Sequence, residues 1–176
     1  MTRVATRRLL GCFEIGFRRG TGADEVAVAV PRHPLAQTAE NLVELDEWVR
    51  AGGRVLLLAD PRLEWPSKRP LGDKLRPPPG FADTGLLAHW GLRLDPSDEP
   101  GRQERSVAGR EVETVSPGLL EGGCAISKDR LVARCRMGRG RATVIADADF
   151  LNVEQLGNPA KDNLNALLSE LAELER

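Results

Sequence analysis

The chain has 176 residues, of which 41% are hydrophobic and 29% are charged, values typical of one globular domain rather than of a disordered or membrane-embedded chain. Its 25 basic and 26 acidic residues nearly cancel, so we expect no general attraction to nucleic acid or to an anionic membrane. Three Trp, four Phe and no Tyr are too few aromatic residues for a surface that stacks nucleic-acid bases.

The N-terminal segment is rich in arginine, and we predict a loosely ordered basic leader over residues 1–22 followed by a single α/β domain over 23–176. The apolar run at 9–13 is too short for a signal peptide or a transmembrane helix, and Glu14 interrupts it. We therefore expect a cytoplasmic protein, or one held at a membrane through a missing N-terminal anchor or through a partner.

Strand and helix patterns alternate in the first third of the domain. Residues 25–30 are valine-rich and predict a buried strand, residues 34–50 carry an apolar stripe at helical spacing, and residues 54–59 predict a second buried strand. Gly52 and Gly53 end the helix between the two strands. This order, with apolar strands, predicts a parallel βαβ unit covered by helices on both faces.

Residues 60–80 contain six prolines and five basic residues, a composition that predicts a long ordered loop. Trp65 and Leu71 are expected to fix parts of this loop against the domain. A loop of this length inside a compact domain is usually functional or disordered. Its function is left open between a solvated surface and a surface that binds a partner protein or an anion.

The second half of the chain contains shorter elements. The pattern predicts a helix at 82–90, short strands at 92–94 and 110–115, a polar turn-rich stretch at 95–105, a β-hairpin formed by 131–136 and 141–146, and a closing helix that Asn158 and Pro159 begin.

Three carboxylates, Asp60, Asp147 and Asp149, follow predicted strands. Ligands of open α/β sheets bind beyond the carboxyl ends of the strands, so these acids would converge on a hard cation such as Mg²⁺ if the two strands are neighbours. Asp at a strand end also caps turns and helices. Both interpretations remain open from the sequence.

No complete catalytic set is present in the sequence. Cys124 has no histidine after it in the chain, and a pair with His89 would depend on the fold. Ser116 and Ser127 lack the glycine-flanked elbow of serine hydrolases, and there is no P-loop, dinucleotide fingerprint or zinc-ligand spacing. The three cysteines do not form a disulfide framework, and whether Cys124 and Cys135 are bridged is left open.

A resemblance to a known family begins at Gly138. The sequence Gly-Arg-Gly-Arg-Ala-Thr-Val-Ile-Ala-Asp-Ala-Asp-Phe-Leu-Asn, and the later Asp162-Asn163 that precedes a leucine-rich helix, resemble the closing segment of glutamine-amidotransferase-like domains in auxiliary proteins of ABC-type transport and gliding-motility systems. Residues 45–56 and the Asp60-Pro61 pair resemble the helix-then-strand segment of the same family.

The resemblance implies a fold and a role. The implied fold class is α/β, a flavodoxin-like three-layer sandwich with a mostly parallel sheet, a C-terminal β-hairpin and a closing helix. The catalytic Cys elbow and the His-x-Glu of true amidotransferases are missing, so we expect no enzyme activity and no cofactor. The role predicted is a non-catalytic accessory domain of a bacterial membrane-associated system. It would recognise either a protein partner, such as a membrane protein, or a small ligand.

The binding residues predicted for that role lie after the two strands, in the proline-rich loop and at the last helix. They are Asp60, Arg62, Trp65, Asp147, Asp149 and Asn163. The alternative prediction is a metal-dependent hydrolase in which Asp60, Asp147 and Asp149 hold Mg²⁺ at the carboxyl edge of the sheet.

Overall fold

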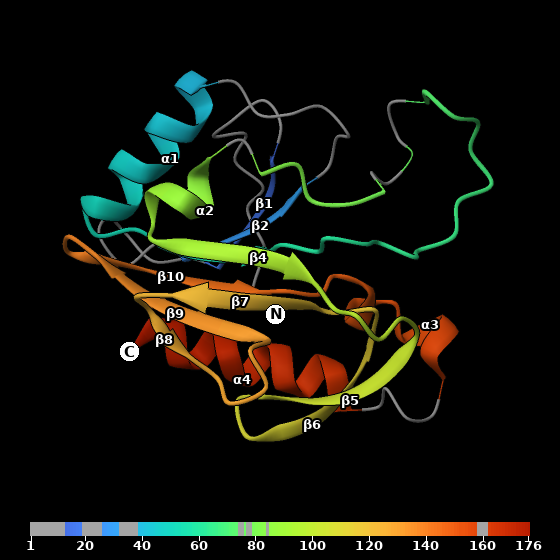
Figure 1. Ribbon diagram of the computed structural model, residues 1–176. Helices are drawn as coiled ribbons and strands as arrows, with labels where there is room; N and C mark the ends of the chain where they lie inside the picture. Colours follow the sequence, from blue (N-terminus) through green and yellow to red (C-terminus); the bar gives the residue numbers. More distant parts are fainter. Residues whose placement is uncertain are drawn as a thin grey trace.

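Figure 1 shows the computed structural model of the chain. The structure describes residues 39–73, 76, 79–83, 85–157 and 162–176 with their side chains, and the backbone of residues 13–18 and 26–31. Most of the predicted leader and the predicted helix start at Asn158 and Pro159 lie outside the described residues.

The largest sheet has six strands in the order β1-β2-β3-β10-β9-β8. Their bounds are β1 Phe13–Arg18, β2 Val26–Pro31, β3 Arg54–Leu58, β8 Ala125–Ile126, β9 Val132–Met137 and β10 Gly140–Ile145. β3 lies in the centre, parallel to both β2 and β10. The pairs β1–β2, β9–β10 and β8–β9 are antiparallel. The apolar central strand explains this position, because every residue from Val55 to Ala59 is at most 1% exposed.

Helices cover the two faces of this sheet (Figure 1). Helix α1 (Ala39–Arg50) lies on one face, where Leu45 and Val49 are buried. Helix α4 (Asn163–Glu175) lies on the opposite face and contacts β2, β3 and β10. Gly140 in β10 permits the approach of α1, since a Cβ there would lie 1.9 Å from the carbonyl oxygen of Val49.

Two small antiparallel sheets complete the described fold. Strands β4 (Leu92–Pro96) and β7 (Gly118–Gly122) pair along their length, and strands β5 (Arg102–Val107) and β6 (Arg110–Val115) form a hairpin beside α4. Three short helices join these parts: α2 (Leu86–His89), the 3-10 helix η1 (Asp149–Leu151) and α3 (Val153–Leu156).

The prediction of a mostly parallel, flavodoxin-like sandwich is therefore wrong. Only two of the five strand pairings in the main sheet are parallel in the described part of the chain, and the two smaller sheets are antiparallel. The parallel βαβ unit of β2, α1 and β3 is present as predicted. The error arose in the polar second half, where β5, β7 and β8 have too little apolar alternation to be recognised as strands.

Several local predictions agree with the structure. The β9–β10 hairpin and β6 lie within one residue of their predicted bounds, and residues 60–80 contain no helix or strand where they are described. Residues 13–18, placed in the predicted leader, form β1 at the sheet edge. Among the described residues, no helix is long and apolar enough to span a membrane.

Candidate functional site

Three acidic side chains meet at the carboxyl edge of the main sheet. β3 and β10 are parallel neighbours, so the segments that follow them leave the sheet at the same edge. Asp60 follows β3, whereas Asp147 and Asp149 follow β10, and the backbone N–H of Ala148 donates to Asp60 Oδ2 at 2.9 Å. The predicted convergence of the three acids therefore occurs, and we call this cluster, together with Glu64, the acidic corner.

Asp60 and Asp147 accept hydrogen bonds from backbone N–H groups with both of their carboxylate oxygens. Asp60 Oδ1 accepts from the N–H of Arg62 at 2.8 Å, in addition to its bond from Ala148. Asp147 accepts from the N–H groups of Val115 and Phe150, each at 2.9 Å. The two residues thus hold three segments together, namely the start of the proline-rich loop, the end of β6 and the turn into η1.

Burial raises the pKa of all three aspartates above the ordinary value. Desolvation has the largest effect on the pKa of Asp60, and the backbone N–H donors partly offset it. The pKa of Asp147 is raised well above its usual range by burial and by the nearby charge of Asp60. For Asp149, burial and the charges of Asp60 and Glu64 raise the pKa to about 6, although the N–H of Glu64 acts in the opposite direction.

Asp149 is linked directly to the proline-rich loop. Its Oδ2 accepts a hydrogen bond from the backbone N–H of Glu64 at 2.6 Å. The side chain of Glu64 is fixed in turn, because the Ser116 hydroxyl donates to its Oε1 at 2.6 Å and Arg62 Nε lies 3.2 Å from the same oxygen. Ser116 has a φ of 49°, a left-handed conformation that is unusual for serine.

A pocket of about 460 Å³ opens beside this pair of carboxylates. It is lined by Glu64, Gly101, Arg102, Val115, Asp149, Asn152, Gln155 and Leu156. Arg102 is held at the wall because its guanidinium donates to the backbone oxygens of Leu156 and Gln155 at 3.1 and 3.0 Å. We call this the Asp149 pocket, and its volume lies in the range of sites for small molecules.

The remaining predicted binding residues lie in different surroundings. Arg62 has a side chain that is 59% exposed, and Trp65 is 40% exposed. Asn163 is fully buried at the start of α4 and makes three hydrogen bonds, accepting from the N–H of Glu113 and donating to the backbone oxygens of Glu113 and Phe150. Asn163 therefore joins α4 to β6 and η1 and does not line the Asp149 pocket.

The candidate residues Cys124 and His89 make other interactions and do not pair with each other. Cys124 and Cys135 form a disulfide, which settles a question that the sequence left open and leaves Cys124 no free thiol. His89 lies 3.2 Å from Asp46 in the α1–α2 contact. No group of three or more His, Cys, Asp or Glu side chains is placed to hold a metal ion in the described portion of the chain.

Sequence reasoning missed Glu64, Arg102 and Gln155 as members of a site. Glu64 lies four residues after Asp60 in a loop whose composition is dominated by prolines and basic residues, so it did not stand out as a site residue. Arg102 and Gln155 come from segments far apart in the sequence, and no local pattern connects them. Their approach depends on the β5–β6 hairpin lying beside α3.

No family model and no curated protein matches the chain. Among solved structures, it is similar to an exo-β-1,4-mannosidase from Opitutaceae bacterium strain TAV5, with 16% identity over 81% of this chain and 24% of that one and a TM-score of 0.49. It is also similar to the β-galactosidase of Rahnella sp. R3, with 16% identity over 85% of this chain and 22% of that one and a TM-score of 0.45. The GH42 β-galactosidase Gan42B gives 17% identity, coverages of 74% and 21%, and a TM-score of 0.44.

These matches correct the family prediction. The solved structures that are similar to the chain are glycoside hydrolases, and none of those three is described as glutamine-amidotransferase-like. The predicted family, the non-catalytic accessory role and the absence of enzyme activity are contradicted by these neighbours, whose names are those of glycoside hydrolases. Two residues that carried the resemblance, Asp147 and Asn163, hydrogen-bond to backbone groups of this fold. Every chain must satisfy its buried backbone groups, so these residues do not identify a family.

The chain spans less than a quarter of the length of each of these enzymes. At TM-scores below 0.5, the similarity assigns neither a fold nor a substrate to this chain. What the Asp149 pocket can do follows from the side chains that line it.

Proposed function

We propose that the chain is a hydrolase that acts by general acid–base catalysis in the Asp149 pocket. The observation that carries the proposal is a carboxyl group with a pKa of about 6 lining an open pocket of about 460 Å³, beside a second carboxylate. Enzymes tune catalytic carboxyl groups toward neutral pH by burial and by neighbouring charge, which are the two causes that act on Asp149.

Asp149 would serve as the proton donor. With a pKa of about 6, a usable fraction of this carboxyl group carries a proton in weakly acidic solution. One carboxylate oxygen accepts the N–H of Glu64, and the described structure gives the other, Oδ1, no hydrogen-bond partner. That oxygen would donate the proton to the leaving-group oxygen of a substrate as its bond to the reacting centre breaks.

Glu64 would serve as the base. Ser116 and Arg62 fix its Oε1, and the backbone N–H of the same residue binds Asp149, so the two carboxyl groups are held in one arrangement. Glu64 would take a proton from a water molecule as the water oxygen bonds to the reacting centre. The proton lost by Asp149 and the proton gained by Glu64 then balance the hydrolysis.

Arg102 and Gln155 give the pocket its polar character. The two bonds from Arg102 to backbone oxygens leave its guanidinium, whose side chain is 52% exposed, beside the pocket opening. Such a wall suits a small substrate rich in hydroxyl or other oxygen acceptors. The predictions of a protein partner and of Mg²⁺ at Asp60, Asp147 and Asp149 remain predictions, and this scheme uses neither.

The experiment is a hydrolysis assay with chromogenic aryl glycosides, aryl esters and aryl phosphates between pH 5 and pH 8. We expect one class to be hydrolysed, with kcat falling as the pH rises through about 6, because Asp149 must be protonated to act as the acid. Asp149→Asn and Glu64→Gln should each lower kcat by about 10²–10⁴-fold.

The matched control is Asp83→Asn. Asp83 is an exposed aspartate that also accepts backbone N–H bonds, from Gly85 and Leu87, and it lies outside the pocket. This variant should keep the wild-type kcat. The proposal fails if the wild-type chain turns over no substrate class above the buffer rate, or if Asp149→Asn is as active as the wild type.

A further inference from the structure

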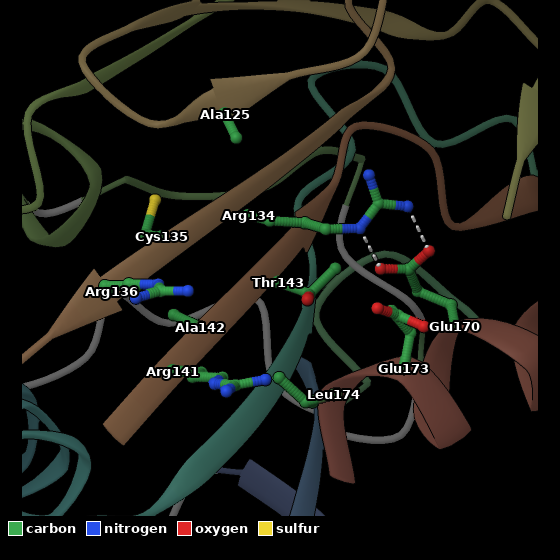
Figure 2. Close-up of a pocket in the computed structure, with 10 residues that line it drawn as sticks. All are labelled: Ala125, Arg134, Cys135, Arg136, Arg141, Ala142, Thr143, Glu170, Glu173 and Leu174. Atoms are coloured by element: carbon green, nitrogen blue, oxygen red, sulfur yellow. Dashed lines mark hydrogen bonds and ion pairs between the residues drawn. The ribbon is translucent and has the colours of Figure 1, made fainter. Parts of the chain in front are cut away.

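A second pocket lies between strands β9 and β10 of the main sheet and the C-terminal half of α4 (Figure 2). Its volume is about 220 Å³. Three arginines (Arg134, Arg136 and Arg141) and two glutamates (Glu170 and Glu173) supply the charged groups of its wall. None of these residues lines the Asp149 pocket.

Both glutamates are already paired with other arginines. Glu170 is fully buried, and its two carboxylate oxygens accept from Arg134 Nε and Nη2 at 2.7 and 2.5 Å. Glu173 lies 2.7 Å from the guanidinium of Arg176. The negative charge of this wall is therefore largely balanced before Arg136 and Arg141 are considered.

Arg136 and Arg141 face each other without a described partner. The two residues occupy directly opposite positions of the antiparallel β9–β10 pair, so their side chains emerge on the same face of the sheet. Figure 2 shows them side by side, and its dashed lines join only Arg134 and Glu170. Neither guanidinium has a hydrogen bond or an ion pair with any residue in the described part of the structure.

Like charges directly opposite each other destabilise a strand pair. Arg136 and Arg141 are such a pair in the β9–β10 hairpin. A bound anion would offset their mutual repulsion, and guanidinium groups bind the oxygens of phosphate with paired hydrogen bonds.

We propose that this pocket binds a phosphate-type oxyanion between Arg136 and Arg141. Thr143 also lines the pocket and supplies a hydroxyl donor on the same strand as Arg141. A volume of about 220 Å³ holds a phosphoryl group and a small organic portion attached to it. The chemistry is shared by free phosphate and by a phosphomonoester, and the experiment distinguishes these two sources.

The test is isothermal titration calorimetry of the whole chain with inorganic phosphate, sulfate and phenyl phosphate at constant ionic strength. We expect saturable binding of phosphate with one site per chain. Arg136→Gln and Arg141→Gln should each weaken it about tenfold to a hundredfold, the loss expected for a hydrogen bond to a charged group. Tighter binding of phenyl phosphate would identify a phosphomonoester as the ligand, and equal binding would identify the free oxyanion.

The control is Arg139→Gln in the turn between the same two strands. Arg139 donates to the backbone oxygen of Ala51 and does not line the pocket, so its replacement removes the same charge nearby without removing a binding group. It should weaken phosphate binding less than threefold. Equal weakening by Arg139→Gln and Arg136→Gln, or no saturable binding up to tens of millimolar, would overturn the proposal.

A thermal melt separates binding from a purely structural role. Without phosphate, Arg136→Gln should melt at the wild-type temperature or above it, because one of the two opposed charges is gone. With phosphate, only the wild type and the Arg139→Gln control should gain stability. A lower melting temperature of Arg136→Gln without phosphate would assign the arginine pair to the fold and overturn the proposal.

Discussion

At the scale of single residues, the polar groups of the carboxyl edge divide into two kinds. Asp60, Asp147 and Asn163 use their side-chain oxygens on backbone N–H groups, so they hold loops and strands in place. Asp149 and Glu64 use only part of their hydrogen-bonding capacity on the fold and also line a pocket. This division explains why acids that look alike in the sequence are expected to respond differently to substitution.

Asn163 gives the sharpest stability prediction at this scale. Asn163→Ala removes three hydrogen bonds at a fully buried position and leaves the N–H and C=O of Glu113 and the C=O of Phe150 without a partner. We expect the free energy of unfolding to fall by about 3 kcal/mol or more, since each of the three buried unsatisfied groups costs about 1–3 kcal/mol. Urea denaturation followed by circular dichroism measures this change.

The control for Asn163→Ala is Asn165→Ala, two residues further along α4. Asn165 is exposed and donates to Asp162 at 3.2 Å, so its loss should cost less than about 0.5 kcal/mol. Equal destabilisation by the two substitutions would show that Asn163 contributes only helix propensity and does not join α4 to β6.

The sequence indicated these residues more readily than their roles. The position of Asp60 after β3 and of Asp147 after β10 followed from apolar strands that end at an acid, and β3 and β10 are indeed neighbours. The partners of these acids are backbone N–H groups of Val115, Phe150 and Ala148, which have no sequence signature. A backbone donor is present at almost every residue, so only the fold decides which one is reached.

At the scale of elements, the β7–β8–β9 region is held by a covalent bond as well as by strand pairing. Cys124 lies between β7 and β8, and Cys135 lies in β9 with only 3% of its surface exposed. β8 contains two residues and pairs only with β9 in the main sheet, so hydrogen bonds alone hold it weakly. The disulfide therefore supports an edge that is otherwise short of contacts.

Reduction of this disulfide should lower stability measurably. The two cysteines are separated by 11 positions, and loop-closure entropy predicts a contribution of about 3 kcal/mol for a loop of this size. A thermal melt with and without a phosphine reductant should show a lower melting temperature in the reduced protein. Disulfides persist in oxidising compartments, so the reduced form would also be the form present in a reducing cytoplasm.

A double variant, Cys124→Ala with Cys135→Ala, separates this bond from other effects of the reductant. It retains Cys12, and the reductant should leave its melting temperature unchanged. If the reductant lowers the melting temperature of this variant by as much as that of the wild type, the stabilisation does not come from the Cys124–Cys135 bond.

At the scale of the whole molecule, the prediction from sequence succeeded where apolar periodicity was strong and failed where pairing was non-local. The unit β2-α1-β3 and the β9–β10 hairpin follow from apolar runs, helical spacing and glycine turns. The pairing of β4 with β7 joins segments more than twenty residues apart, and β5–β6 carries charged residues on much of its length. Neither pattern specifies its partner, so the antiparallel additions that correct the fold class could not be predicted.

The residues of the two pockets differ in the same way in how far the sequence predicts them. The three aspartates of the acidic corner followed from strand ends, whereas Arg102 and Gln155 joined the Asp149 pocket through the β5–β6 hairpin and α3. Arg136 and Arg141 lie in a hairpin that the sequence did predict, and an assigned register would have shown them opposite each other. A hairpin register is therefore enough to find a candidate anion site that residue types alone did not reveal.

The three raised carboxyl groups make the stability of the whole fold depend on pH. A carboxyl group whose pKa is higher in the folded state binds its proton more tightly there, so ionisation favours the unfolded state. For Asp149 the window runs from about pH 4 to just above pH 6, because its pKa rises from 3.8 to about 6 on folding. The raised pKa values of Asp60 and Asp147 act in the same direction.

We expect the free energy of unfolding to fall as the pH rises through this window, with Asp149 contributing about 3 kcal/mol at a cost of about 1.4 kcal/mol per pKa unit. Urea denaturation at intervals from pH 4 to pH 8 measures the slope. Asp149→Asn keeps an oxygen that accepts the Glu64 N–H but cannot ionise, so its slope should be shallower and should retain only the contributions of Asp60 and Asp147. If the unfolding free energy of this variant falls with pH as steeply as that of the wild type, the pH dependence comes from other groups. Asp149 would then not have the raised pKa on which the proposed hydrolase depends.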